Sequence, residues 1–206
     1  MDAVRVSALR ERLAGTGWLE AVGGFAGDLR RAVSRRGAEG LLLVGTEAYE
    51  PWHLAAHLHD EAAWSDVPRL APTLLRHQVP PQAPAHLAHG LRRLTEAGRG
   101  ATVLVIAPAA ADGTLLERVQ DARRHGATVL AVDGAGPAGP AAAGLADLAD
   151  LAHRRLAVGT AEEEPFDLAQ HLVSLAAGQR PARCAALQRL AALAGRLTAG
   201  PTVSRW

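Results

Sequence analysis

The chain has 206 residues, of which 49% are hydrophobic, so it is long enough to build one α/β domain around a substantial core. Its 22 basic and 21 acidic residues leave a net charge of +1, which excludes nucleic-acid binding by bulk charge and a charge-driven disordered chain. Cys184 is the only cysteine, which excludes an intramolecular disulfide and a cysteine-based zinc site.

The first half of the chain predicts a helical segment followed by two strands. Apolar residues recur at helical spacing over 7–36, which predicts one or two helices with a break at Gly23 and Gly24. The apolar run 41–44 predicts a buried parallel strand that ends at Gly45. We further expect a helix over 50–64, a strand within 70–78, a loop over 79–84 and a helix over 85–97.

The second half alternates strands and helices more regularly. The runs 102–107 and 128–132 are continuously apolar, which is typical of central strands. The other expected elements are a helix over 112–125, a flexible loop over 133–144, a short helix or turn over 145–151, a strand over 155–158, and helices over 165–178 and 182–199.

This alternation predicts an α/β fold, a three-layer sandwich in which a five-stranded parallel sheet is flanked by helices. We divide the chain into an N-terminal helical segment over 1–36 that packs on the domain, an α/β domain over 37–180, and a C-terminal helix and tail over 181–206. The N-terminus lacks the apolar core of a signal peptide, and the longest apolar run, 101–111, is too short to span a membrane. We therefore expect a cytoplasmic protein that contacts neither membrane nor nucleic acid.

The carboxyl ends of the predicted strands are the expected ligand site, because open parallel sheets bind ligands beyond that edge. One loop there follows the 41–44 strand and another follows the 102–107 strand. The predicted ligand-binding residues are Gly45, Thr46 and Glu47 in the first loop and Asp112, Gly113 and Thr114 in the second. Asp112 and Gly113 have an alternative interpretation, which is that they simply start a helix.

Two stretches resemble the SIS (sugar isomerase) domain and its phosphoheptose isomerase-like branch. Residues 101–134 are similar to the centre of that domain, where a strand ends in a Ser/Thr-rich loop, a helix follows, and the next strand begins after a Gly-Ala pair. Residues 40–62 are similar to the first strand and helix of the branch, in which the helix carries His-x-x-x-Glu. The resemblance implies the SIS fold and assembly as a dimer or tetramer with sites between subunits.

The loop after the 102–107 strand differs from the phosphate-binding loop that the resemblance implies. In the family, hydroxyl groups and amides at a helix N-terminus hold the phosphate. Here Pro108 and three alanines replace the hydroxyls, Asp112 adds negative charge, and Thr114 is the one hydroxyl left. We therefore predict a divergent SIS-domain protein that has lost the usual phosphosugar loop and acts as a non-canonical ligand-binding, regulatory or interaction protein.

A histidine-rich helix supports an alternative function. His53 and His57 are four residues apart, so a helix places them on one face, where they can share a metal. The resemblance places them on a His and a Glu that bind zinc, and places Glu163 and His171 on the later pair of ligands, with Asp167 competing for the carboxylate position.

The implied site is thus a zinc ion held by His53, His57, Glu163 and His171, with His57 and His171 as the proton-transferring residues of a metal-dependent sugar (phosphate) isomerase-like enzyme. Against this stands the plainer interpretation that two histidines at this spacing are solvated surface residues. Among partners, we expect a homo-oligomer, with Leu187, Leu190, Leu193 and Leu197 as one candidate interface, and a small sugar-like ligand or a protein partner.

Overall fold

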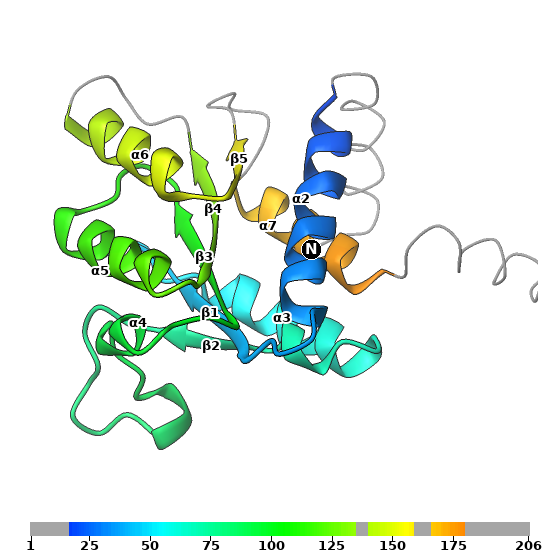
Figure 1. Cartoon of the computed structure of the whole chain (residues 1–206), viewed down its shortest axis with the longest axis horizontal. Helices are drawn as coiled ribbons and strands as arrows, with labels where there is room; N and C mark the ends of the chain where they lie inside the picture. The colour runs from blue at the N-terminus through cyan, green and yellow to red at the C-terminus, as the bar shows by residue number, and fades with distance from the viewer. Residues whose placement is uncertain (1–16, 135–139, 159–165, 180–206) are drawn as a thin grey trace, which may run out of the picture.

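The computed structural model describes residues 17–134, 140–158 and 166–179 (Figure 1). It confirms the predicted α/β sandwich: five strands form one parallel sheet in the order β2-β1-β3-β4-β5. The strands are β1 (Gly40–Val44), β2 (Pro72–Leu75), β3 (Ala101–Ala107), β4 (Thr128–Gly134) and β5 (Arg154–Val158).

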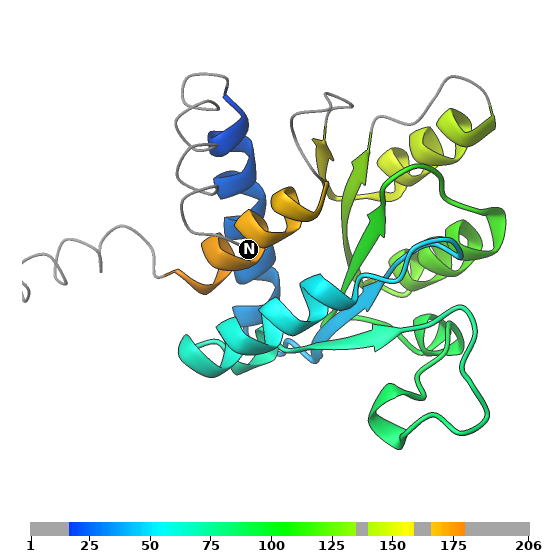
Figure 2. The same ribbon diagram turned by 180° about the vertical axis from the view of Figure 1, so that it is seen from behind.

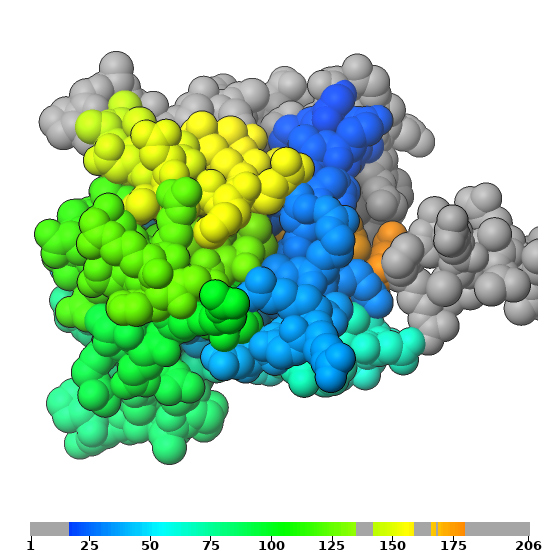
Figure 3. Space-filling view, in the orientation of Figure 1, coloured from blue at the N-terminus to red at the C-terminus, as the bar shows by residue number. Residues whose placement is uncertain are grey.

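Helices cover both faces of the sheet. On one face lie α2 (Trp18–Ser34), α3 (Trp52–Trp64) and α7 (Phe166–Gly178), and on the other lie α4 (Arg92–Thr95), α5 (Gly113–Arg124) and α6 (Pro140–Leu151) (Figures 1 and 2). Two short 3₁₀ helices, η1 (Pro68–Leu70) and η2 (Ala85–Leu87), flank β2 in the chain. In the space-filling view, α2 lies beside the segment that carries β5 (Figure 3).

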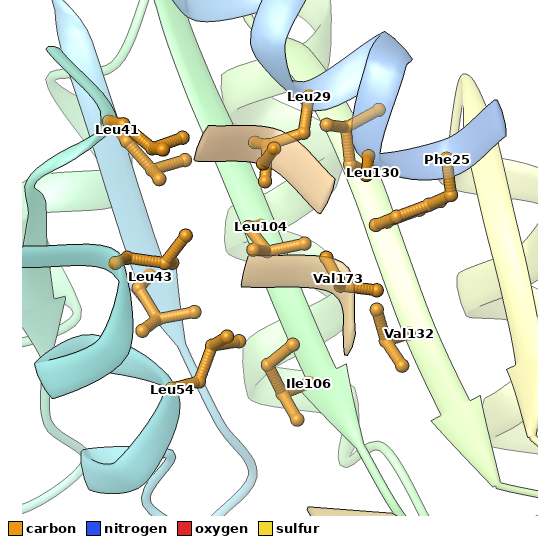
Figure 4. Packing of buried hydrophobic residues seen from close by; sticks show 14 of the residues in the cluster. Phe25, Leu29, Leu41, Leu43, Leu54, Leu104, Ile106, Leu130, Val132 and Val173 are labelled. Atoms are coloured by element: carbon orange, nitrogen blue, oxygen red, sulfur yellow. The ribbon is translucent and has the colours of Figure 1, made fainter. Parts of the chain in front are cut away.

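Two hydrophobic cores follow from the alternation of side chains along each strand. Leu41 and Leu43 point to the face covered by α2, α3 and α7, while Leu42 and Val44 belong to the core on the other face. In the first core, Leu104 and Ile106 of β3 meet Leu29, Leu54 and Val173 from the three helices (Figure 4). Because β3 is covered on both faces, all seven of its residues are buried, which explains its unbroken apolar sequence.

The strand order reverses between β1 and β3. The chain passes from β1 to β2 on one side and then returns to pair β3 on the other side of β1. The loops after β1 and β3 therefore leave the sheet in divergent directions, which is the arrangement at which open α/β sheets bind ligands.

Two glycines permit close backbone packing at this edge. A Cβ atom on Gly45 would lie 1.8 Å from the carbonyl oxygen of Tyr49, so the turn after β1 doubles back tightly only because Gly45 has no side chain. A Cβ atom on Gly134 would lie 1.9 Å from the carbonyl oxygen of Pro108, so the loop after β3 lies directly against the end of β4.

The predicted break at Gly23 and Gly24 is wrong. Helix α2 runs through both glycines, which lie on its exposed side. On the opposite side, Val22 and Phe25 are buried in the first core, and this packing outweighs the low helix propensity of glycine. The part of the predicted segment before Gly17 lies outside the described residues.

Two other predictions about elements need correction. Residues 85–97 do not form one helix; η2 and α4 occupy part of this range, and Gly90 between them forms a parallel bridge to Arg76 that holds the segment against the edge of the sheet. The expected loop 133–144 is helical from Pro140, because α6 buries Leu145 and Leu148 in the second core. The predicted helix 182–199 lies outside the described residues, and within the described segments no helix has the length and apolar character needed to cross a membrane.

We predict that Arg30 stabilises the fold by capping α7. Its Nη1 donates hydrogen bonds to the carbonyl oxygens of Ala177 and Gly178, at 2.9 and 3.1 Å, where the end of a helix carries partial negative charge. Arg30→Ala should lower the free energy of unfolding by about 1–3 kcal/mol, measured by urea denaturation. The matched control Arg31→Ala removes an exposed guanidinium that pairs with Asp28 and should change stability by less than about 1 kcal/mol; equal effects of the two variants would contradict the prediction.

Candidate functional site

The loop after β1 holds the first group of predicted ligand-binding residues. Gly45 and Thr46 are buried, and the amide of Tyr49 donates to the carbonyl oxygen of Thr46 at 3.1 Å, which closes a tight turn. Glu47, at the tip of this turn, is exposed. Of the three residues, Glu47 is thus the one whose side chain is free to meet a ligand, while Gly45 and Thr46 shape the turn.

The second group lies at the start of α5. Asp112 is the N-cap residue of this helix, and its Oδ1 accepts a hydrogen bond from the amide of Leu115 at 2.9 Å. Gly113 and Thr114 follow in the first helical turn and are exposed. The alternative interpretation of Asp112 and Gly113 as a helix start is therefore confirmed, and the protein's own carboxylate occupies one of the amides to which an anion would bind.

The histidines predicted on two separate helices come together between α3 and α7. Nε2 of His57 and Nδ1 of His171 are 3.2 Å apart, and their ring centroids are 4.5 Å apart. The His53 ring stacks nearly parallel on that of His57, with centroids 5.5 Å apart. The fourth predicted ligand, Glu163, lies outside the described residues.

This cluster is an array of rings and not a preformed metal cage. Within the described segments, no group of three or more His, Cys, Asp or Glu side chains is arranged to hold a metal ion. The stacking of His53 on His57 aligns the two ring faces, whereas a shared metal requires ring nitrogens that converge on one point. The pairing of His57 with His171 does bring two nitrogens together, and these are the two residues predicted to transfer protons.

Two effects lower the pKa of the paired histidines. For His57 the main cause is burial, followed by the charge of His53, while the carboxylate of Asp60 opposes the shift. For His171 the main cause is again burial, followed by the charge of His57. Both effects favour neutral imidazoles, which can accept protons or donate a lone pair to a metal.

A polar network next to His171 connects α7 to the loop after β1. The Tyr49 hydroxyl donates to Oδ1 of Asp167 at 3.1 Å and accepts from Nε2 of Gln170 at 2.7 Å. The Tyr49 ring also packs edge-on against Phe166, with centroids 6.1 Å apart. Burial raises the pKa of the Tyr49 hydroxyl, so this group stays protonated and can act as a donor.

Gln170 is a residue of this site that the sequence analysis missed. It is 1% exposed, and its Oε1 is buried without a hydrogen-bond partner among the described residues. Because a buried amide oxygen without a partner is costly, it marks a place where a ligand group or water is needed. The sequence did contain one signal for it: on a helix, Gln170 lies on the same side as Asp167, three residues earlier, and next to His171.

Asp133, at the carboxyl end of β4, was not among the predicted ligand-binding residues. It is fully buried, and Nε of Arg155 donates to its two carboxylate oxygens at 2.7 and 3.0 Å. Burial raises the pKa of this carboxyl, and the guanidinium opposes the shift. This pair joins β4 to β5 and stabilises the edge of the sheet that carries the candidate site.

Comparisons with known proteins give similarities to solved structures only. No family model matches the chain, and no curated protein matches it. The sugar isomerase domain of an RpiR transcription factor from Sphaerobacter thermophilus is similar over 82% of this chain and 85% of that chain, with 15% identity and a TM-score of 0.48. The Vibrio vulnificus NanR protein, solved in complex with ManNAc-6P, is similar over 95% of this chain and 70% of that chain, with 12% identity and a TM-score of 0.45.

A third similar structure is a candidate sugar-binding protein from Salmonella typhimurium LT2, with 17% identity and a TM-score of 0.46. The match covers 84% of this chain and 49% of that one, so the chain spans about half the length of that relative. The fold described above rests on its own strand order and buried sheet.

We predict that the histidine pair makes the metal-free protein less stable in mild acid. The pKa values of His57 and His171 are lowered in the folded protein. At pH values between these lowered pKa values and about 6.5, the pKa of a free histidine, the unfolded chain therefore binds more protons than the folded chain does. The free energy of unfolding should therefore fall as the pH drops below about 6.5. Urea denaturation in the presence of a chelator measures this, and His171→Gln should flatten the slope.

The control is His125→Gln, at an exposed position after α5, which should leave the slope unchanged. A slope that is the same in His171→Gln and in the unmodified chain would contradict the prediction.

Proposed function

We propose that this chain is a divergent SIS-type domain that binds a small sugar-like ligand at the carboxyl edge of its sheet without the usual phosphate grip. In this proposal the protein acts as a ligand-binding, regulatory or interaction protein and does not turn over phosphosugars. The observation that carries the proposal is the side chain of Asp112, which accepts a hydrogen bond from the Leu115 amide at the N-terminus of α5.

The physical reason is competition for one site. A helix N-terminus attracts a phosphate through free amides and partial positive charge. Here the Asp112 carboxylate accepts from one of those amides and offers an incoming phosphate a negative charge at close range. Glu47, exposed on the neighbouring loop, adds to the negative charge of this edge.

We predict that removing this carboxylate creates affinity for phosphate. Serine caps helices about as well as aspartate, so Asp112→Ser should keep α5 intact while it removes the charge. Isothermal titration with inorganic phosphate should show no binding to the unmodified chain and measurable binding to Asp112→Ser.

The control variant is Asp121→Ser, which removes a carboxylate from the same helix away from its N-terminus and should bind no phosphate. Phosphate binding by the unmodified chain that Asp112→Ser does not strengthen would rule out the proposal.

The pairing of His57 with His171 favours a second candidate function, a metal-dependent isomerase-like enzyme. Two nitrogens bound to one tetrahedral zinc ion are about 3.3 Å apart, because each Zn–N bond is about 2.0–2.1 Å long. The observed distance of 3.2 Å is close to this value, and imidazoles are ligands that zinc favours. His53 would complete the set by turning its ring, together with Glu163, and zinc would polarise a carbonyl group while His57 or His171 carries a proton.

For this second candidate we predict stoichiometric zinc. The chain, treated with a chelator and then titrated with zinc, should bind one ion per chain, and His53→Ala and His171→Ala should each weaken binding at least tenfold. His86→Ala, an exposed histidine remote from α7, is the control. Unchanged affinity in the first two variants, or no zinc binding at all, would eliminate the metal-dependent enzyme.

The proposal includes self-association of the chain into a dimer or tetramer, with or without a further protein partner. It is supported by the family resemblance and by the leucine spacing over 182–199, which lies outside the described residues.

A further inference from the structure

A pocket of about 520 Å³ lies beyond the carboxyl ends of β1 and β2. The turn after β1 forms one wall and the segment after β2 forms the other. Its lining includes Glu47, Tyr49, Glu50, Arg76, His77 and Val79. The volume is within the range of small-molecule sites, which is about 300–1,000 Å³.

Arg76 is held rigidly at this pocket. Its Nε donates to both carboxylate oxygens of Glu50, at 3.0 and 3.1 Å, and its guanidinium lies 5.2 Å from the centroid of the Trp52 ring. The Trp52 indole in turn donates to Glu50 at 2.8 Å. The guanidinium is thus fixed from two sides, and the Arg76 side chain is 19% exposed, so it still reaches the pocket surface.

The recognition groups of Arg76 remain unused. All of its side-chain hydrogen bonds to the described residues involve Nε, so its two terminal amino groups have no hydrogen-bond partner there. A guanidinium that is held at Nε and free at both terminal nitrogens is a preorganised donor pair, because little side-chain entropy remains to be lost on binding.

The pocket offers acceptors as well as donors. Glu47 makes no hydrogen bond to the described residues and is exposed at the rim. Nε2 of His77 lies 3.1 Å from the carbonyl oxygen of Gly45; a carbonyl only accepts, so Nε2 carries the proton and Nδ1 of the neutral ring is an acceptor. The Tyr49 hydroxyl links the pocket to Gln170, whose Oε1 lacks a partner among the described residues.

The charge of the lining selects between ligand classes. The lining carries two carboxylates, those of Glu47 and Glu50, against the one guanidinium of Arg76, so a phosphate that carries nearly two negative charges is disfavoured. A hydroxyl group both donates and accepts, and therefore satisfies Arg76 and Glu47 together without adding charge.

We infer that this pocket binds an uncharged, hydroxyl-rich molecule of monosaccharide size, with the terminal amino groups of Arg76 as its main donors and Glu47 as its main acceptor. The inference rests on the proposed function and extends it by naming the ligand class and the residues that select it. Val79 and the prolines that follow provide the apolar wall for the carbon skeleton of such a ligand.

The test uses matched sugars as probes: D-glucose, D-galactose, D-mannose and D-fructose, each free and as its 6-phosphate. Ligand-observed saturation-transfer NMR on the full chain should show binding of at least one free sugar and weaker binding of its phosphate. Arg76→Lys keeps a cation beside Glu50 but loses the donor pair, so it should weaken binding roughly tenfold, the loss expected for one charge-assisted hydrogen bond.

The matched control is Arg93→Lys. Arg93 is exposed and pairs with Glu96 away from this pocket, so this substitution should leave sugar binding unchanged. Glu47→Gln should narrow the preference for the free sugar over its phosphate, because it removes the unpaired carboxylate.

Three results would overturn the inference: no binding of any free sugar, tighter binding of the phosphate than of its free sugar, or equal affinity in Arg76→Lys and Arg93→Lys. Its failure is distinguishable from that of the proposed function. The proposed function is tested by the binding of inorganic phosphate to Asp112→Ser, whereas this inference is tested by the binding of neutral sugars to the unmodified chain and to Arg76→Lys.

Discussion

The burial of β3 between two helical layers is the constraint on which the rest of the structure depends. All seven residues of β3 are buried, and they join β1 on one side to β4 on the other. Because every strand runs in the same direction, the loops after β1, β3 and β4 meet at one edge. The candidate pocket lies at that edge, between the loop after β1 and the segment after β2.

Charge at this edge determines which ligands are compatible with it. Asp112 satisfies an amide at the start of α5 with an internal anion, and Glu47 leaves a second carboxylate exposed nearby. Glu50 is neutralised by Arg76, whose terminal donors stay available. In the proposed function, this edge offers hydrogen bonds to a neutral polar ligand and lacks the positive potential that would hold a phosphate.

Helix α7 brings polar groups from a distant part of the chain to the loop after β1. Asp167 and Gln170 bind the Tyr49 hydroxyl, and His171 faces His57 one turn further on. The Tyr49 network therefore lies beside the histidine cluster, because Gln170, which donates to the Tyr49 hydroxyl, immediately precedes His171 on α7.

The sequence alone determined the class of fold, since unbroken apolar runs such as 102–107 occur where a strand is covered on both faces. It also placed Asp112 at a helix start and put His53 and His57 on one face, because capping and helical spacing are local. The continuity of α2 through Gly23 and Gly24 was decided by burial against the sheet, which local propensity does not contain.

Only the tertiary structure decided which distant residues meet. Gln170 is 121 residues from Tyr49, and Arg76 is 26 residues from Glu50, so no local pattern predicts either contact. These contacts exist because parallel strands with helical crossovers bring separate strand ends to one edge, and the packing of α3 against α7 then sets the distances between their side chains.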